Sequence, residues 1–334
     1  MDLDFPPSGN TRVPAARKPR REEYHVGIIC ALAIEHAAVV GMLDEAYPTL
    51  STVHGDDNHY AFGRIGLHNV VVACLPAGVT GTVSATRVAS NMQRTFRDIK
   101  VGLMVGIGGG VPSTQRDIRL GDVVVSQPEG AHGGVVQWDF GRTEAGGCFR
   151  RTRTLNKPPA GLLHALQAIQ SRTFTDGIDL NECLSFMAGA KPLLMDRCRY
   201  PGAENDCLFV ASYEHVPGST CEGCDKTQVV HRQTRPSTSP CVHYGNIASG
   251  NQVMKDAVTR DRIGDRENII CFEMEAAGLM DDFPCLVIRG ICDYADSHKN
   301  DEWQPYAAAA AAAFARMLLR DFIQPSGVSQ SACT

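Results

Sequence analysis

The sequence lacks the long apolar segment that a membrane-spanning helix needs. Such a helix requires about 18 to 20 consecutive apolar residues, and the longest apolar block, 306–315, is shorter and rich in alanine. Segment 1–23 is basic and contains prolines, but it has no apolar core of the kind found in signal peptides. We therefore expect no membrane partner, and we interpret 1–23 as a disordered tail.

An excess of positive charge is missing as well. The chain has 334 residues, and its 32 lysines and arginines are outnumbered by 37 aspartates and glutamates, which gives a net charge of -5. Non-specific binding of nucleic acid needs a basic surface, so the composition excludes that class of partner. The length and the apolar content of 43% are those of a globular enzyme or binding module with a small-molecule partner.

Cysteine, in contrast, is abundant. The 13 cysteines are odd in number, and several lie inside apolar runs, which is typical of reduced, buried thiols and predicts a cytoplasmic location. Cys221 and Cys224 form a Cys-x2-Cys pair near His215, so a structural zinc site is one reading. Because there is only one such pair, the sequence favours unligated thiols and no bound metal.

Apolar runs of strand length alternate with amphipathic stretches of helical length. The expected strands are 25–29, 70–75, 101–105, 123–126, 268–272 and 285–291, and the expected helices are 34–43, 83–96, 159–170, 273–280 and 303–320. This alternation predicts a single α/β domain over 24–322, with a sheet covered by helices. The strands are apolar throughout, as in a sheet buried on both faces.

The pattern fails over 190–240, where polar residues, proline and glycine dominate and only 207–213 resembles a strand. A segment this long is not an ordinary connection, and we interpret it as an insertion near the active site and a candidate lid. The polar segment 323–334 is expected to be a second disordered tail.

Four segments carry residues that are candidates for catalysis or ligand binding. Glycines including Gly108 and Gly109 follow the strand 101–105 and let a ligand approach the backbone, although a plain glycine turn is equally compatible. Glu273 and Glu275 flank a methionine, and buried carboxylates need hydrogen-bond donors such as sugar hydroxyls. A first-turn helical position would explain the same acids without a ligand.

Two further acids follow strands. Asp293 stands at the carboxyl end of the strand 285–291, where ligands of open α/β sheets bind, and Glu35 follows the first strand. Helix capping is the alternative explanation for both.

Taken together, these segments resemble the nucleoside phosphorylase and nucleosidase superfamily in residue type, order and spacing. The resemblance covers about 24–320, and its most specific parts are Glu273-Met274-Glu275 and Arg289-Gly-Ile-Cys-Asp293. In particular, the chain looks like fungal members that occur alone or at the N-terminus of NOD-like receptors. The resemblance implies a central, mostly parallel mixed sheet flanked by helices, and a homo-oligomer, a dimer or trimer.

The resemblance also implies roles for individual residues. Asp293 matches the acid that protonates the departing purine, although Cys292 replaces the serine that often precedes it. Glu275 would accept hydrogen bonds from the ribose hydroxyls, with Met274 beneath the sugar and Glu273 in support. Val253 stands where an aromatic ring often contacts the base.

The nucleophile distinguishes hydrolases from phosphorylases in this family. Phosphorylases hold phosphate with arginines and a hydroxyl at places that here read Met104, Ile107 and 33–35, whereas nucleosidases have a glutamate matching Glu35. We therefore expect hydrolysis without a cofactor, with Glu35 activating water and Asp293 as the acid. The alternatives are a phosphorylase that binds phosphate through Arg64, Arg87 or Arg142, and an inert nucleoside-binding sensor.

The leading substrates are adenosine and its nucleotides, ATP included. A nucleotide needs positive charge beside the 5′ group, and the insertion offers Arg232 and Arg235, while Lys299 follows Asp293 closely.

Overall fold

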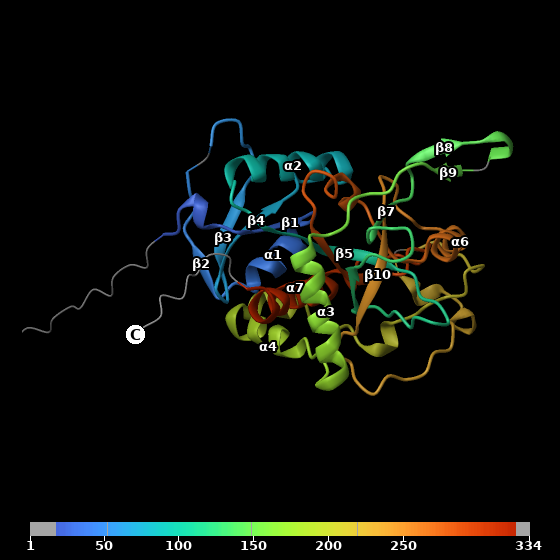
Figure 1. Ribbon diagram of the computed structural model, residues 1–334. Coiled ribbons are helices and arrows are strands. Elements are labelled where there is room, and N and C mark those ends of the chain that lie inside the picture. The colour runs from blue at the N-terminus through green and yellow to red at the C-terminus, as the bar shows by residue number, and fades with distance from the viewer. Residues whose placement is uncertain (1–17, 52, 148, 219, 325–334) are drawn as a thin grey trace, which may run out of the picture.

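The computed structural model describes residues 18–324 except 52, 148 and 219 (Figure 1). Most of both expected tails therefore lies outside the described residues. Within them, Arg21–Glu23 forms a 3-10 turn, and Tyr24 is fully buried at the start of the domain. At the other end, the Ile323 carbonyl lies 3.0 Å from Nε2 of His68, which joins the end of the described chain to the sheet.

The core is a ten-stranded mixed sheet in the order β11-β10-β6-β12-β5-β1-β4-β3-β2, with β7 paired to β10. Six of its strand pairs are parallel and four are antiparallel, which confirms the expected mixed, mostly parallel architecture. The strands are β1 (Val26–Cys30), β2 (Glu45–Tyr47), β3 (Tyr60–Ile65), β4 (His68–Cys74), β5 (Val101–Gly110), β6 (Val123–Ser126), β7 (Val135–Gln137), β10 (Val242–Ser249), β11 (Ile269–Glu273) and β12 (Leu286–Asp293).

One end of this sheet closes on itself. The long strand β5 pairs with β1 and β12 in parallel, and its last residues also pair antiparallel with β11, where Cys271 lies opposite Gly110. Strands β5, β12, β6, β10 and β11 thereby form a closed ring, while β1, β4, β3 and β2 extend from it as an open wing. The carboxyl ends of β5, β11 and β12 meet on one side of the ring.

Helices cover both faces of the sheet. The α-helices are α1 (Ala33–Gly41), α2 (Thr82–Thr95), α3 (Ala160–Thr175), α4 (Asn181–Ala190), α5 (Pro192–Arg197), α6 (Ala257–Glu267) and α7 (Gln304–Met317). In Figure 1, α2 lies above the sheet, and α1, α3, α4 and α7 gather below it. Strand β1 alternates accordingly, with Ile28 in the core beside α1 and α7 and Ile29 in the core beside α2. No helix within the described residues is long and apolar enough to cross a membrane.

The alanine-rich helix α7 packs directly on β12. Its alanines, 307–313, are all buried, and a Cβ placed on Gly290 of β12 would lie 1.8 Å from the Ala307 carbonyl oxygen. Small residues on both elements therefore set the distance between helix and strand. The alanine run therefore serves the close packing of α7 on β12.

Three local expectations are wrong. The helix expected over 273–280 is absent, because β11 continues through Glu273 and is followed by a 3-10 turn, Ala276–Gly278. The glycines at 108–110 form the end of β5 rather than a turn, since they pair with β12 and β11. The strand expected over 207–213 is reduced to a single bridge between Phe209 and Val229.

Smaller elements stand outside the main sheet. The hairpin β8 (Gly141–Thr143) and β9 (Phe149–Arg151) projects from the body of the molecule (Figure 1). The 190–240 segment contains α5 and the 3-10 turns Ala203–Asn205, Cys221–Gly223 and Lys226–Gln228. It lines a cavity of about 580 Å³ that also touches Cys292 and Asp293, so the insertion lies beside these strand ends.

The contact between Gly290 and α7 leads to the first prediction. Gly290→Ala would force β12 away from α7, and we expect it to lower the free energy of unfolding by about 1 to 3 kcal/mol. Urea denaturation measures this change. The control is Gly189→Ala on the exposed surface of α4, where no atom lies near an added Cβ and alanine favours the helix. Equal stability of the two variants would contradict the proposed packing.

Candidate active site

Residues from six separate segments line one cavity at the carboxyl ends of β5, β11 and β12. It has a volume of about 210 Å³. The lining residues are Ala31, Leu32, Glu35, Thr80, Ile107, Gly108, Gly109, Gln252, Val253, Met254, Phe272, Glu273, Met274, Glu275, Arg289, Cys292, Asp293, Ala295, Lys299 and Gln304. Four carboxylates and two cations thus surround a space of the size of a small ligand.

Arg289 is the centre of the charged cluster. It lies within β12, is fully buried, and its guanidinium forms ion pairs with three glutamates. The contact with Glu273 is the closest, Glu275 lies 3.4 Å away, and Glu35 lies 4.0 Å away. Burial opposes its charge, but these carboxylates raise the pKa of Arg289 above its usual range, so the guanidinium remains a cation.

Glu35 lies at the start of α1, and its two carboxylate oxygens have different roles. Its Oε2 accepts hydrogen bonds from the backbone N–H groups of Ala31 and Leu32 at 2.7 and 2.8 Å, which caps the helix. Its Oε1 accepts one hydrogen bond, from Ile107 N–H at 2.8 Å, and so retains a lone pair for a further donor. Burial raises the pKa of Glu35, while Arg289 and the backbone donors oppose that shift.

Glu273 and Glu275 have different surroundings although only one residue separates them. Glu273 is bound by Arg289 and accepts hydrogen bonds from the backbone N–H groups of Glu275 and Ala276 at 3.1 and 3.0 Å. Glu275 accepts one from Gly81 N–H at 3.2 Å, and burial raises its pKa to about 7. Glu273 is therefore a positioning residue, and Glu275 retains oxygen lone pairs for a ligand.

Asp293 is the last residue of β12. Its Oδ1 accepts a hydrogen bond from Ala295 N–H at 2.8 Å, and its Oδ2 is bound by Cys292 Sγ at 3.1 Å and by the Lys299 ammonium. Burial lowers the pKa of Lys299, but the adjacent Asp293 carboxylate outweighs it and raises that pKa above the usual range. The cysteine thus takes the place of a hydroxyl donor, and Lys299 supplies the stronger contact.

The glycines of β5 provide the space for these side chains. A Cβ on Gly106 would lie 2.5 Å from both Arg289 Nη1 and Glu35 Oε1, and one on Gly109 would lie 2.7 Å from Asp293 Oδ1. The glycine-rich sequence is therefore explained by close approach to the charged cluster, and Gly108 and Gly109 line the cavity.

The structure brings most of the residues named from the sequence to this cavity. Eight of them line it: Glu35, Gly108, Gly109, Val253, Glu273, Met274, Glu275 and Asp293. Val253 is 50% exposed, so it lies at the mouth. Lys299 also lines the cavity.

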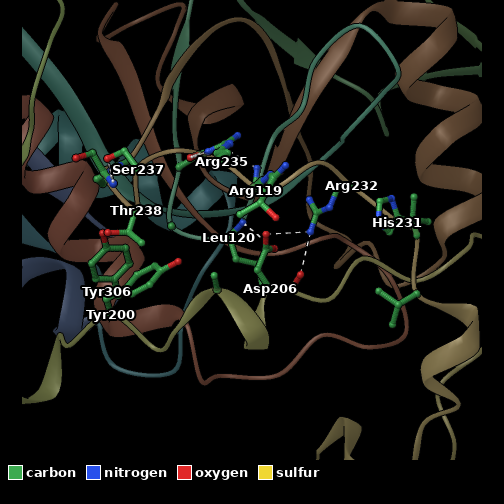
Figure 2. Close-up of a pocket in the computed structure, with 18 residues that line it drawn as sticks. Arg119, Leu120, Tyr200, Asp206, His231, Arg232, Arg235, Ser237, Thr238 and Tyr306 are labelled. Atoms are coloured by element: carbon green, nitrogen blue, oxygen red, sulfur yellow. Dashed lines mark hydrogen bonds and ion pairs between the residues drawn. The ribbon is translucent and has the colours of Figure 1, made fainter.

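Arg232 and Arg235 do not line this cavity, which corrects the expected 5′ contacts. Arg232 pairs with Asp206 at 2.9 Å, and the two terminal nitrogens of the Arg235 guanidinium bind Asp122 at 2.7 and 2.8 Å. Figure 2 shows both arginines around a different pocket, with Arg232 turned toward Asp206. The Arg235 pair joins the insertion to Asp122, directly before β6, whereas Arg232 and Asp206 both lie within the insertion.

The role of Arg289 was not predicted from the sequence. The residue belongs to a motif that carries the family resemblance, but its strand is otherwise apolar and was interpreted as uniformly so. An arginine within a strand whose residues are all buried must find carboxylates, and this was the available signal.

Removal of the central cation is the second prediction. Arg289→Met would leave buried carboxylates without their counter-ion, and we expect a loss of about 3 to 5 kcal/mol of stability at pH 7. The loss should shrink as the pH falls, because glutamates with raised pKa values become neutral in the folded protein. Urea denaturation over a pH series measures both effects.

The matched control is Arg142→Met on the exposed strand β8, which should change stability by less than about 0.5 kcal/mol. If Arg289→Met were as stable as the unmodified protein at pH 7, the cluster would not depend on this cation.

Known proteins resemble this chain in sequence and in fold. No protein-family model matches the chain. A nucleotide-binding leucine-rich repeat (NLR)-like protein of the fungus Hyaloscypha variabilis is 48% identical over 93% of this chain, which spans 31% of that relative. A 5'-methylthioadenosine/S-adenosylhomocysteine nucleosidase of Mycobacterium bovis is 25% identical over 88% of this chain and 95% of its own length.

Further similarities extend to a relative that the chain covers in part and to solved structures. The ATP nucleosidase Cap17 of Escherichia coli is 25% identical over 89% of this chain, which covers 50% of that protein. The crystal structure of a methylthioadenosine/S-adenosylhomocysteine nucleosidase from Helicobacter pylori shares the fold, with a TM-score of 0.56 at 16% identity over 89% of this chain and 98% of its own. The nucleosidases that resemble this chain belong to the nucleoside phosphorylase and nucleosidase superfamily, and the chain has the fold of one of them.

Proposed function

We propose that the chain hydrolyses the N-glycosidic bond of a purine nucleoside or nucleotide of the adenosine type and releases the free base. The observation that carries this proposal is the placement of Glu35, Glu275 and Asp293 around one small cavity, with Arg289 behind them. The relatives that are named for an activity are nucleosidases of adenosine-containing molecules, which supports the substrate class.

Asp293 acts as the general acid in this proposal. Its Oδ1 has a single backbone donor and so can face a ring nitrogen of the base, while Lys299 and Cys292 hold Oδ2. Asp293 enters the reaction with a proton on Oδ1 and transfers it to the purine as the glycosidic bond breaks, so the purine leaves as a neutral base. The proton that Glu35 takes from water returns to Asp293 through solvent, which closes the cycle. The Lys299 ammonium then stabilises the carboxylate that remains.

Glu35 acts as the general base toward water. Glu35 lines the cavity, its Oε1 accepts a hydrogen bond only from Ile107 N–H, and its raised pKa makes it a better proton acceptor than an exposed glutamate. The water loses a proton to Glu35 while its oxygen bonds to the anomeric carbon. Two acids with separate tasks follow the logic of inverting glycoside hydrolysis.

The sugar is held between these two acids. Glu275 accepts hydrogen bonds from ribose hydroxyls, and Met274, which also lines the cavity, packs against the sugar ring. The transition state resembles an oxocarbenium ion, whose positive charge is favoured where carboxylates outnumber cations. The cavity satisfies this condition with four carboxylates against Arg289 and Lys299.

The same balance disfavours phosphate as the nucleophile. Among the described residues that line the cavity, both cations are already bound to carboxylates. The arginines that the sequence left open for phosphate lie elsewhere: Arg64 pairs with Glu45, Arg87 with Asp57 and Arg142 with Glu144. A phosphate dianion would therefore enter a site of net negative charge without a free guanidinium.

The third prediction concerns product release. The purified protein is incubated with adenosine, AMP, ATP, inosine and methylthioadenosine, each with and without phosphate, and the bases and sugars are separated by chromatography. We expect adenine release that does not depend on phosphate. Asp293→Asn and Glu35→Gln should each lower the rate by about 10² to 10⁴-fold, the usual contribution of a general acid or base.

The matched controls are Asp196→Asn and Glu144→Gln, two exposed carboxylates outside the cavity that should retain full activity. Release that requires phosphate and yields a sugar phosphate would make the chain a phosphorylase. No release from any substrate, together with binding of a nucleoside, would favour the inert sensor.

A further inference from the structure

A cluster of soft metal ligands lies in the insertion, outside the candidate active site. The ligand atoms of His215, Cys221 and Cys224 all lie within 4.8 Å of one another. Cys221 begins a 3-10 turn, and the Cys224 N–H donates to the Cys221 carbonyl at 3.2 Å, so a single turn of backbone links the two cysteines. Two thiolates and an imidazole are the ligand types that Zn²⁺ prefers in structural sites.

A second histidine beside this cluster has no hydrogen bond to either ring nitrogen in the described structure. His298 lies in the connection between β12 and α7, is 7% exposed, and both ring nitrogens are buried without a hydrogen bond in the described structure. Its ring centre lies 5.4 Å from that of His215, and Cys221 Sγ lies 3.8 Å from its backbone oxygen. A buried imidazole that lacks a donor or acceptor is unfavourable, and a metal ion would satisfy it.

The surroundings orient both imidazoles. The His215 Nε2–H donates to the Thr220 carbonyl at 3.1 Å, which leaves Nδ1 with the free lone pair. The His298 ring stacks on Phe209 with centroids 4.0 Å apart, and the Asp296 carboxylate lies 3.8 Å from its Nδ1. Carbonyl and carboxylate partners on the second nitrogen are typical of histidines that bind zinc.

We propose that His215, Cys221, Cys224 and His298 form a structural Zn²⁺ site. Binding displaces one proton from each thiol, and the two thiolates neutralise the charge of the ion. Zinc bonded to all four residues would join the insertion to the connection that follows β12. Because Lys299 directly follows His298, the site would also fix the lysine that contacts Asp293.

The first test is the metal content of the intact protein. Purified without chelator, it should contain about one zinc ion per chain by mass spectrometry of the metal. Cys221→Ser and Cys224→Ser should lose the zinc, whereas Cys241→Ser, which alters an exposed thiol outside the cluster, should retain it. Removal of zinc with a chelator should lower the melting temperature of the unmodified protein and leave that of Cys221→Ser unchanged.

The second test uses Co²⁺ alone as a spectroscopic probe in the zinc-depleted, unmodified protein. Its spectra therefore do not depend on whether a variant folds. A tetrahedral site with two thiolates predicts a thiolate-to-cobalt charge-transfer band and intense d–d bands. His298→Gln should weaken cobalt binding by more than about tenfold, which distinguishes a ligand from a neighbouring ring.

Three results would overturn the proposal. They are no binding of zinc or cobalt at micromolar concentration, cobalt spectra without the thiolate band, or a disulfide between Cys221 and Cys224 in freshly isolated protein. The readouts are metal content, spectra and melting temperature, so they are independent of whether the chain proves to be a nucleosidase.

Discussion

The arrangement of the candidate site depends on one buried arginine. Arg289 holds Glu273 firmly and keeps Glu35 and Glu275 within 4.0 Å, so it brings together acids from α1, from β11 and from the turn after β11. Transfer of so many charges out of water is unfavourable, and only mutual pairing and backbone donors make it tolerable. The glycines of β5, the close packing of α7 on β12 and the closure of β5 against β11 all serve to bring these strand ends together.

The cluster leaves a cavity with a surplus of negative charge, and this surplus gives the site its chemical character. It favours a positively charged sugar in the transition state and disfavours an anionic nucleophile. Asp293 differs from the other acids because its counter-ion is Lys299, on a short connection after β12 rather than in the sheet. Asp293 is therefore held by a segment that also contacts the insertion. Ser297 Oγ accepts a hydrogen bond from the His215 N–H at 3.0 Å, and the His298 carbonyl lies 3.8 Å from Cys221 Sγ.

Much of the fold could be predicted from the sequence, because strands buried on both faces are uniformly apolar and easily recognised. The placement of Asp293 and Glu35 after their strands followed from the same pattern. The functions of Arg289 and of the 3-10 turn after Glu273 could not, since both depend on which carboxylates the sheet brings to one edge. Arg232 and Arg235 were misplaced because the sequence of the insertion does not reveal that Asp206 and Asp122 bind them.

The most direct test of the account is the origin of the oxygen atom on the sugar product. The reaction is run in ¹⁸O-labelled water with phosphate present, using the substrate that releases its base fastest, and the sugar is reduced at once to prevent exchange at the anomeric carbon. The account predicts one ¹⁸O atom at that carbon and no sugar phosphate. An unlabelled sugar 1-phosphate would contradict it.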